Sequence, residues 1–189
     1  GYGDTGGGWG GVYRWCKQHI SQGYPVHDFD MIIIHLDADV AEKHYSESGI
    51  HNIPNDDIPC VKPCPPAIDT VDALETVLKG WLNYRTDETF PRNWVVCIPS
   101  KCTEAWVITA LYRHSNPEIF PIECNSNLET WLSQRPLRQG ERLIKGSKKQ
   151  KRIYQNNASI ITKQWGVVVE NCITADLFQR NVIDTIGHI

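Results

Sequence analysis

Apolar residues along the chain follow two different periods, one typical of helices and one typical of buried strands. In residues 8–22, apolar side chains recur every three or four positions, which predicts a short amphipathic helix. Two dense β-branched runs, residues 31–36 and 94–98, instead predict strands that are buried on both faces, as in a parallel sheet. A weaker strand is expected over residues 118–122.

The spacing of apolar residues predicts further helices between and after these strands. Asp69, Thr103 and Thr174 each precede such a pattern and are residue types that cap helices. Another helix is expected over residues 153–164, and the proline-rich residues 46–68 are expected to form a long surface loop. Strands that alternate with helices favour a single α/β domain over residues 1–189, with a mostly parallel sheet flanked by helices.

The composition is that of a soluble globular protein. Hydrophobic residues make up 41% of the chain and charged residues 22%. The apolar runs, such as residues 31–34 and 94–98, are far shorter than the ~18 residues that span a bilayer, so no membrane partner is expected. The seven cysteines are an odd number, whereas disulfide frameworks usually have an even number and belong to small secreted domains. We therefore expect free thiols and a reducing, cytoplasmic compartment.

Charge is distributed unevenly along the chain. Residues 135–152 carry eight basic side chains against one acid, Glu141, and so sum to +7. Since the whole chain carries −3, the other residues sum to −10. A basic segment on an acidic protein is a candidate contact surface for a phosphate backbone, although a solvated loop and helix face explains the same charges. The candidate nucleic-acid-binding residues are Arg142, Lys145, Lys148, Lys149, Lys151 and Arg152.

The sequence Asp37-Ala-Asp39 directly follows the first predicted strand. Ligands of open α/β sheets bind beyond the carboxyl ends of the strands, where two aspartates can turn toward one hard cation. Mg²⁺ needs only one or two carboxylates and fills its other positions with water and phosphate oxygens. The alternative is that an aspartate here only caps the next helix.

Glu104 follows the second predicted strand and begins the next helix. If the two strands are neighbours, Glu104 and the aspartates lie at the same edge of the sheet, and the basic segment would provide a phosphate track beside a metal site. Such sites hydrolyse phosphodiesters with a metal-activated water. The alternative is a first-turn acid that is favoured by the helix dipole.

These segments resemble a Toprim-like family of bacterial proteins, related to the nuclease half of OLD-family (overcoming lysogenization defect) proteins. The resemblance rests on the sequences around Asp37 and Asp39, around Glu104, from Lys148 to Tyr154 and at 172–178. It implies a Toprim-like fold and a Mg²⁺- or Mn²⁺-dependent nuclease, with an ATPase as protein partner in phage defence. Asp37, Asp39 and Glu104 would be the catalytic metal ligands, and a lysine, for which we choose Lys148, would stabilise phosphate charge.

One departure from that family keeps a second hypothesis open. Toprim nucleases also carry a glutamate after their first strand, whereas this chain has no glutamate before Glu42. Either the first strand lies upstream of Gly1, or the metal site is incomplete. The second case would make the protein a non-catalytic nucleic-acid-binding or scaffold subunit of such a complex.

Three other sites are weaker. A phosphatase of the haloacid dehalogenase type also uses Asp-x-Asp, but it prefers Thr or Val where this chain has Ala41. Cys60 and Cys64 are spaced for zinc, but no second pair follows at a suitable distance. The glycine-rich residues 6–11 precede a helix, but lack the lysine of a P-loop.

Overall fold

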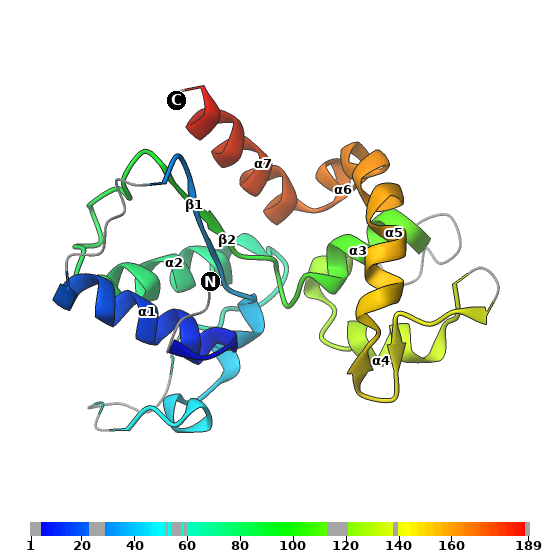
Figure 1. Ribbon diagram of the computed structural model, residues 1–189, viewed down its shortest axis with the longest axis horizontal. Helices are drawn as coiled ribbons and strands as arrows, with labels where there is room; N and C mark the ends of the chain where they lie inside the picture. Colours follow the sequence, from blue (N-terminus) through cyan, green and yellow to red (C-terminus); the bar gives the residue numbers. More distant parts are fainter. Residues whose placement is uncertain are drawn as a thin grey trace.

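The computed structural model describes residues 5–22, 29–51, 53, 58, 60–112, 121–137 and 140–187. Within these residues the fold is mixed α/β, with seven α-helices and two small sheets (Figure 1). The helices are α1 (Gly8–Gln22), α2 (Ile68–Trp81), α3 (Glu104–Tyr112), α4 (Leu128–Gln134), α5 (Lys151–Lys163), α6 (Trp165–Asn171) and α7 (Ile173–Ile186). The strands are β1 (Ile32–His35), β2 (Trp94–Cys97), β3 (Ile144–Lys145) and β4 (Lys148–Lys149).

The first sheet pairs β1 with β2 in parallel, as the sequence predicts. Ile32 lies opposite Trp94, and His35 lies opposite Cys97. The expected burial on both faces is wrong for β1, because Ile34 is buried whereas Ile33 is 52% exposed and His35 is also exposed. The described structure covers only one face of this strand, which leaves alternate side chains in solvent.

The two chain segments stay paired after the strands end. The N–H of Leu36 donates to the carbonyl of Cys97 over 3.0 Å, and the N–H of Asp39 donates to the carbonyl of Lys101, also over 3.0 Å. The residues that follow β1, including a 3-10 helix over Ala38–Glu42, therefore run beside the residues that lead into α3.

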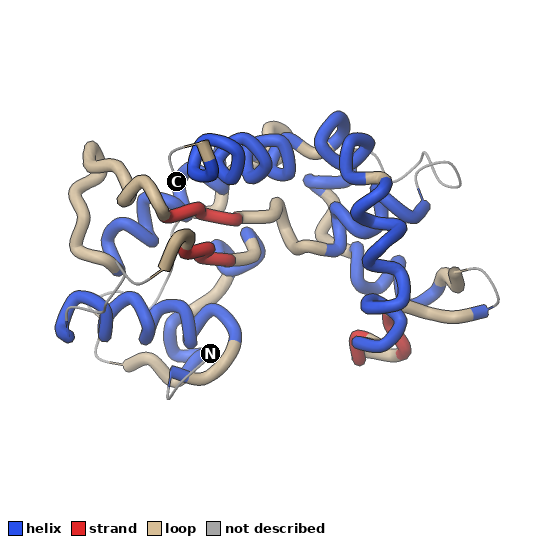
Figure 2. The backbone as a smooth tube through the Cα atoms, turned by 45° about the horizontal axis from the view of Figure 1, so that its top comes forward, coloured by secondary structure: helices blue, strands red, loops and turns tan. Residues whose placement is uncertain are grey.

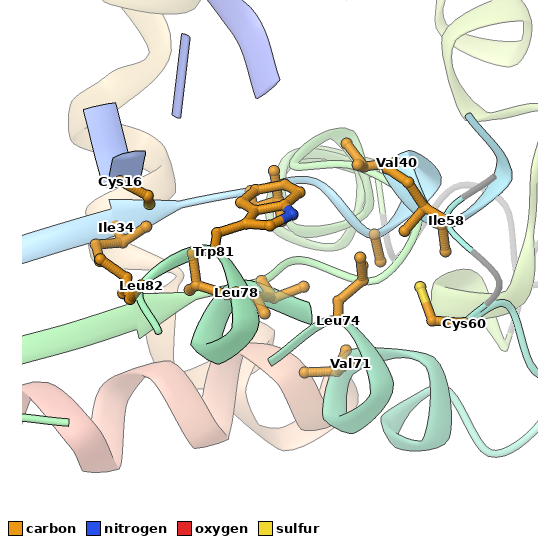
Figure 3. Packing of buried hydrophobic residues seen from close by; sticks show 14 of the residues in the cluster. Cys16, Ile34, Val40, Ile58, Cys60, Val71, Leu74, Leu78, Trp81 and Leu82 are labelled. Carbon is orange, nitrogen blue, oxygen red and sulfur yellow. The ribbon is translucent and has the colours of Figure 1, made fainter. Parts of the chain in front are cut away.

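A first hydrophobic cluster packs α1 and α2 against the parallel sheet (Figure 3). Its centre includes Leu74 and Leu78 of α2, both fully buried, and each such side chain stabilises the fold by ~1.5–3 kcal/mol. The indole N–H of Trp81 donates to the hydroxyl of Tyr45 over 2.8 Å, which satisfies two polar groups inside the cluster. Residues 46–68 are not simply a surface loop, since Ile50, Ile58 and Cys60 belong to this cluster, and Tyr45–Ser48 form a 3-10 helix.

A second hydrophobic cluster is formed by the helices that follow β2. Ile108 of α3, Leu132 of α4 and Val168 of α6 are fully buried there. Figure 2 shows this helical part beside the parallel sheet, with α7 running alongside β2 from one part toward the other. The antiparallel pair β3–β4 packs against α4 and leads directly into α5.

A disulfide joins segments that lie beside the two clusters. Cys64, in the segment before α2, bonds to Cys124 at the end of a 3-10 helix over Ile122–Cys124. The expectation that all cysteines are free is therefore wrong for this pair, because the fold brings two Cα atoms 60 residues apart in sequence to within 5.5 Å. The other five cysteines are free thiols.

A buried glutamate caps α7 from a distant part of the chain. The carboxylate of Glu123 accepts the N–H of Ile173 over 2.7 Å and the N–H of Thr174 over 3.0 Å, as well as the hydroxyl of Thr174. The prediction that Thr174 caps this helix is therefore wrong. Asp69 likewise lies inside the first turn of α2, where Ala67 is the capping residue.

The remaining predicted elements are partly confirmed. The helix expected over 153–164 is α5, which begins two residues earlier. The strand expected over 118–122 lies mostly outside the described residues, and its last residue, Ile122, is in the 3-10 helix. None of the described helices combines the length and the apolar character needed to cross a bilayer.

Candidate metal and phosphate site at the strand ends

The parallel pairing of β1 and β2 brings Asp37 to the start of α3. One carboxylate oxygen of Asp37, Oδ1, accepts both the N–H and the hydroxyl of Thr103, each over 3.1 Å. The Nε2 atom of His35 lies 3.5 Å from the same oxygen and 3.3 Å from the Thr103 hydroxyl. Burial alone would raise the pKa of Asp37, but these bonds and the charges of His35 and Lys149 outweigh it and hold the pKa below its usual value.

Asp39 lies in a very different electrostatic environment, although it is only two residues further along the chain. Burial raises its pKa to about 6, and the charge of Asp37 contributes to the same shift. Lys43 offsets part of the shift, whereas Glu129 and Glu42 add to it. Two carboxylates thus lie near each other with too little positive charge between them. The alternative, that Asp39 caps a helix over residues 41–45, is wrong, because Asp39 lies inside the 3-10 helix Ala38–Glu42 and its capping residue, Asp37, makes no side-chain capping bond.

Glu104 is the first residue of α3, the helix that follows β2, and it is buried, with only 2% exposed. Its Oε1 atom lies 2.8 Å from the ammonium of Lys149 and accepts the hydroxyl of Tyr154 over 3.0 Å. Lys149 also lies 2.9 Å from Oε1 of Glu129 on α4. Burial opposes the charge of Lys149, but its bonds and charge interactions with both glutamates outweigh burial and raise its pKa. The alternative interpretation of Glu104, a first-turn acid favoured by the helix dipole, is confirmed as to position, since Glu104 is the first residue of α3, and its side chain is in addition buried and ion-paired.

The other carboxylate oxygen of Glu104, Oε2, is buried and has no hydrogen-bond partner among the described residues. A buried acceptor without a donor is unfavourable by ~1–3 kcal/mol. Cys102 lies nearby: burial raises the pKa of its thiol, and the charges of Glu104 and Asp37 raise it further. The charges of Glu104 and Asp37 therefore disfavour a thiolate at Cys102.

The structure brings the three predicted carboxylates to one region, but it selects a different lysine. Lys149 contacts Glu104, whereas Lys148 is exposed and forms no ion pair with a described residue. The sequence does not mark Thr103 as a partner of Asp37, Glu129 as a partner of Lys149, or Tyr154 as a partner of Glu104. One feature of the sequence points to the position of Thr103: this residue ends the six-residue connection between β2 and Glu104. The end of a neighbouring parallel strand, where Asp37 lies, is expected beside this connection.

The basic segment forms the β3–β4 hairpin and the start of α5. Arg142 donates to the carbonyl of Ser133 over 2.6 Å, and Lys149 is held by the two glutamates. The other predicted phosphate contacts are exposed: they are Lys145, Lys148, Lys151 and Arg152. The exposed Lys148 is therefore adjacent in sequence to Lys149, which forms the ion pair with Glu104.

The site chemistry fits a divalent cation at Asp37 and Asp39, but not a cation bound by three protein carboxylates. In the described part of the chain, no group of three His, Cys, Asp or Glu side chains is placed to hold one metal ion. Mg²⁺ in proteins commonly keeps several waters and takes one or two carboxylates. The pKa of Asp39 is raised partly by repulsion from the charged Asp37, and a cation bound between the two carboxylates would offset that repulsion.

Comparison with known proteins provides no relative. No protein-family model, no curated protein and no solved structure matches the chain.

Proposed function

We propose that the protein is a metal-dependent nuclease that hydrolyses phosphodiester bonds in DNA or RNA. The observation that carries the proposal is that Asp37, at the end of β1, bonds to Thr103, the residue before Glu104, and that the partner of Glu104, Lys149, is next to the exposed Lys148. Carboxylates beside a basic surface provide the two charges that a phosphodiester substrate needs, namely cation ligands and contacts for the phosphate backbone.

Each residue has a separate role in this proposal. Asp37 is ionised and is oriented by Thr103, so it is the preorganised ligand for Mg²⁺ or Mn²⁺, and Asp39 is the second ligand. A bound cation of this kind supplies an activated water and neutralises phosphate charge. Lys149 and Tyr154 hold Glu104 in place, and the exposed Lys145 and Lys148 contact the phosphate backbone.

Two finer features of the proposal rest on the sequence resemblance. They are a Toprim-like arrangement of the fold and an ATPase as the protein partner. The mixed α/β fold with a parallel strand pair is compatible with the first.

A cleavage assay tests the proposal. The protein is incubated with single- and double-stranded DNA and with RNA, in Mg²⁺ or in Mn²⁺. We expect cleavage that EDTA abolishes, and a loss of at least a hundredfold in Asp37→Asn. Asp184→Asn, which changes an exposed aspartate near the end of α7, is the matched control and should cleave like the wild type. Equal cleavage by Asp37→Asn and the wild type would contradict the proposal.

The second candidate function is a non-catalytic subunit that binds nucleic acid. It is favoured by one observation, the absence of a three-residue metal group among the described residues. It predicts nucleic-acid binding that survives EDTA, with no cleavage in any divalent ion. Replacing Lys145, Lys148, Lys151 and Arg152 by glutamate should weaken binding in both cases and reduce its dependence on salt.

A further inference from the structure

The outer edge of β1 has no strand partner within the part of the chain that the structure describes. β2 is the only described strand paired with β1. The N–H groups of Ile32 and Leu36 donate toward β2, to the carbonyls of Asn93 and Cys97. Because successive peptide groups of a strand point to opposite edges, the N–H groups of Ile33 and His35 face the outer edge. An unpaired strand edge is a template for another extended chain.

A groove of about 770 Å³ runs along this edge between β1 and α1. One wall is the strand segment from Met31 to Leu36, and the other is one face of α1 with Gly8, Val12 and Trp15. Figure 2 shows β1 on the α1 side of the sheet and β2 on the α7 side. A groove between a strand edge and a helix is the geometry in which an extended peptide adds a strand to a sheet.

The lining of the groove indicates what kind of chain fits it. Phe29 is 55% exposed and Ile33 is 52% exposed, and both line the groove, so it presents two exposed apolar side chains to a ligand. No lysine or arginine is among the described residues that line the groove, and its acidic residues are Asp37 and Asp39, at the carboxyl end of β1. This charge disfavours a nucleic acid and favours a segment that ends in a basic side chain.

We propose that the edge of β1 docks an extended segment of a partner protein, with alternating apolar residues and a lysine or arginine next to Asp37 and Asp39. The main chain of this segment pairs with Ile33 and His35, and its apolar side chains cover Phe29 and Ile33. The basic end of this segment contacts Asp37 and Asp39, which the proposed function assigns to a cation, so a bound cation and the segment's basic side chain compete there. The strand pairing and the apolar contacts do not involve these carboxylates and go beyond the proposed nuclease function.

Selection from a displayed library of random eight-residue peptides, in EDTA, tests the chemistry of the occupant. We expect enrichment of peptides with alternating apolar residues and a basic residue at one end. Binding of a selected peptide should fall at least tenfold in Ile33→Glu, and it should be unchanged in Ile183→Glu, which alters an equally exposed isoleucine on α7. No enrichment, enrichment of acidic peptides, or equal binding by both variants would overturn the proposal.

Alternate N-methylation of the selected peptide tests the main-chain pairing. Methyl groups on one alternating set of amides should abolish binding, whereas methyl groups on the other set should leave it within twofold, because only one set faces β1. Bound peptide should also slow hydrogen exchange at the amides of Ile33 and His35. Equal binding by both methylated peptides would overturn the proposal, as would a wild-type dimer that Ile33→Glu converts to monomer, since a second copy would then occupy the edge.

These outcomes are separable from the nuclease test. Peptide binding is measured without metal and depends on Ile33, whereas cleavage depends on Asp37 and on a divalent ion. Failure of either result therefore leaves the other intact.

Discussion

The two halves of the candidate site carry the same chemical groups in opposite electrostatic states. The aspartate side, Asp37 and Asp39, lies at the end of β1 and is served by hydrogen bonds from Thr103 and by the neighbouring His35. The glutamate side, Glu104 and Glu129, shares the ammonium of Lys149. The comparison shows that a lysine of the protein is in ion-pair contact with both glutamates, whereas no described lysine or arginine forms an ion pair with Asp37 or Asp39, which is why we assign an external cation to the aspartate side.

The largest expected effect comes from the disulfide that joins segments beside the two clusters. Closing a loop of 60 residues stabilises a fold by ~4 kcal/mol in the chain-entropy account. Cys64→Ser with Cys124→Ser should therefore lower the free energy of unfolding by about that amount, measured by urea denaturation. Reduced wild-type protein is the control and should match the double variant. An unchanged midpoint of urea denaturation after reduction would show that the two hydrophobic clusters are held together without this disulfide.

Removing the cation from the glutamate side should have the next largest effect. Lys149→Met leaves the buried Glu104 without its ion pair; because the Lys149 side chain is 49% exposed, we expect a cost of ~2 kcal/mol, below the ~3–5 kcal/mol of a fully buried pair. Lys148→Met, at the exposed neighbouring position, is the matched control and should change stability by less than ~0.5 kcal/mol. Adding Glu104→Gln to Lys149→Met should recover part of the loss. If both lysine variants unfold at the same urea concentration, the glutamate side does not depend on Lys149.

A second buried glutamate, Glu123, sharpens the comparison, because its carboxylate accepts N–H donors and not a lysine. Glu123→Ala leaves the first N–H groups of α7 without their acceptor, and lost caps cost ~1–2 kcal/mol. We expect faster hydrogen exchange at the start of α7 together with that loss of stability. Glu141→Ala, at an exposed position, should change neither quantity. Unaltered exchange in Glu123→Ala would mean that α7 does not need this cap.

The smallest expected effect concerns Asp39 and depends on pH. Its folded-state pKa is about 6, compared with 3.8 ordinarily. Between these values the folded state binds more protons than the unfolded state, so the free energy of unfolding falls as the pH rises from ~4 to ~6. Asp39→Asn should remove this fall and raise stability at pH 7 by roughly 1 kcal/mol after solvent screening. If the free energy of unfolding depends on pH in the same way in the wild type and in Asp39→Asn, the claim that negative charge at Asp39 is uncompensated is wrong.

The sequence predicts the parallel strand pair and the meeting of Asp37 with the region of Glu104. Both follow from local patterns: β-branched runs mark β1 and β2, and the carboxyl ends of paired parallel strands meet at one edge. The exposure of Ile33 could not be predicted, because a run of four apolar residues looks the same whether or not a neighbouring element covers its second face.

The partners of the carboxylates could not be predicted from the sequence either. Lys148 and Lys149 are adjacent in a two-residue strand, and only the register of the β3–β4 hairpin decides which one reaches Glu104. Glu123 and Thr174 are 51 residues apart, as Cys64 and Cys124 are 60 apart, and no local pattern marks either pair. Long-range pairs of this kind depend on how the helices pack.

Calorimetric titration with Mn²⁺ at pH 7.5 tests the central claim, that an external cation binds on the aspartate side, most directly. The account predicts saturable binding to the wild type and to Lys149→Met, and no binding to Asp37→Asn with Asp39→Asn. It also predicts weaker binding at pH 5, where Asp39 is protonated. Absence of binding to the wild type, or equal binding to the double aspartate variant, would contradict it.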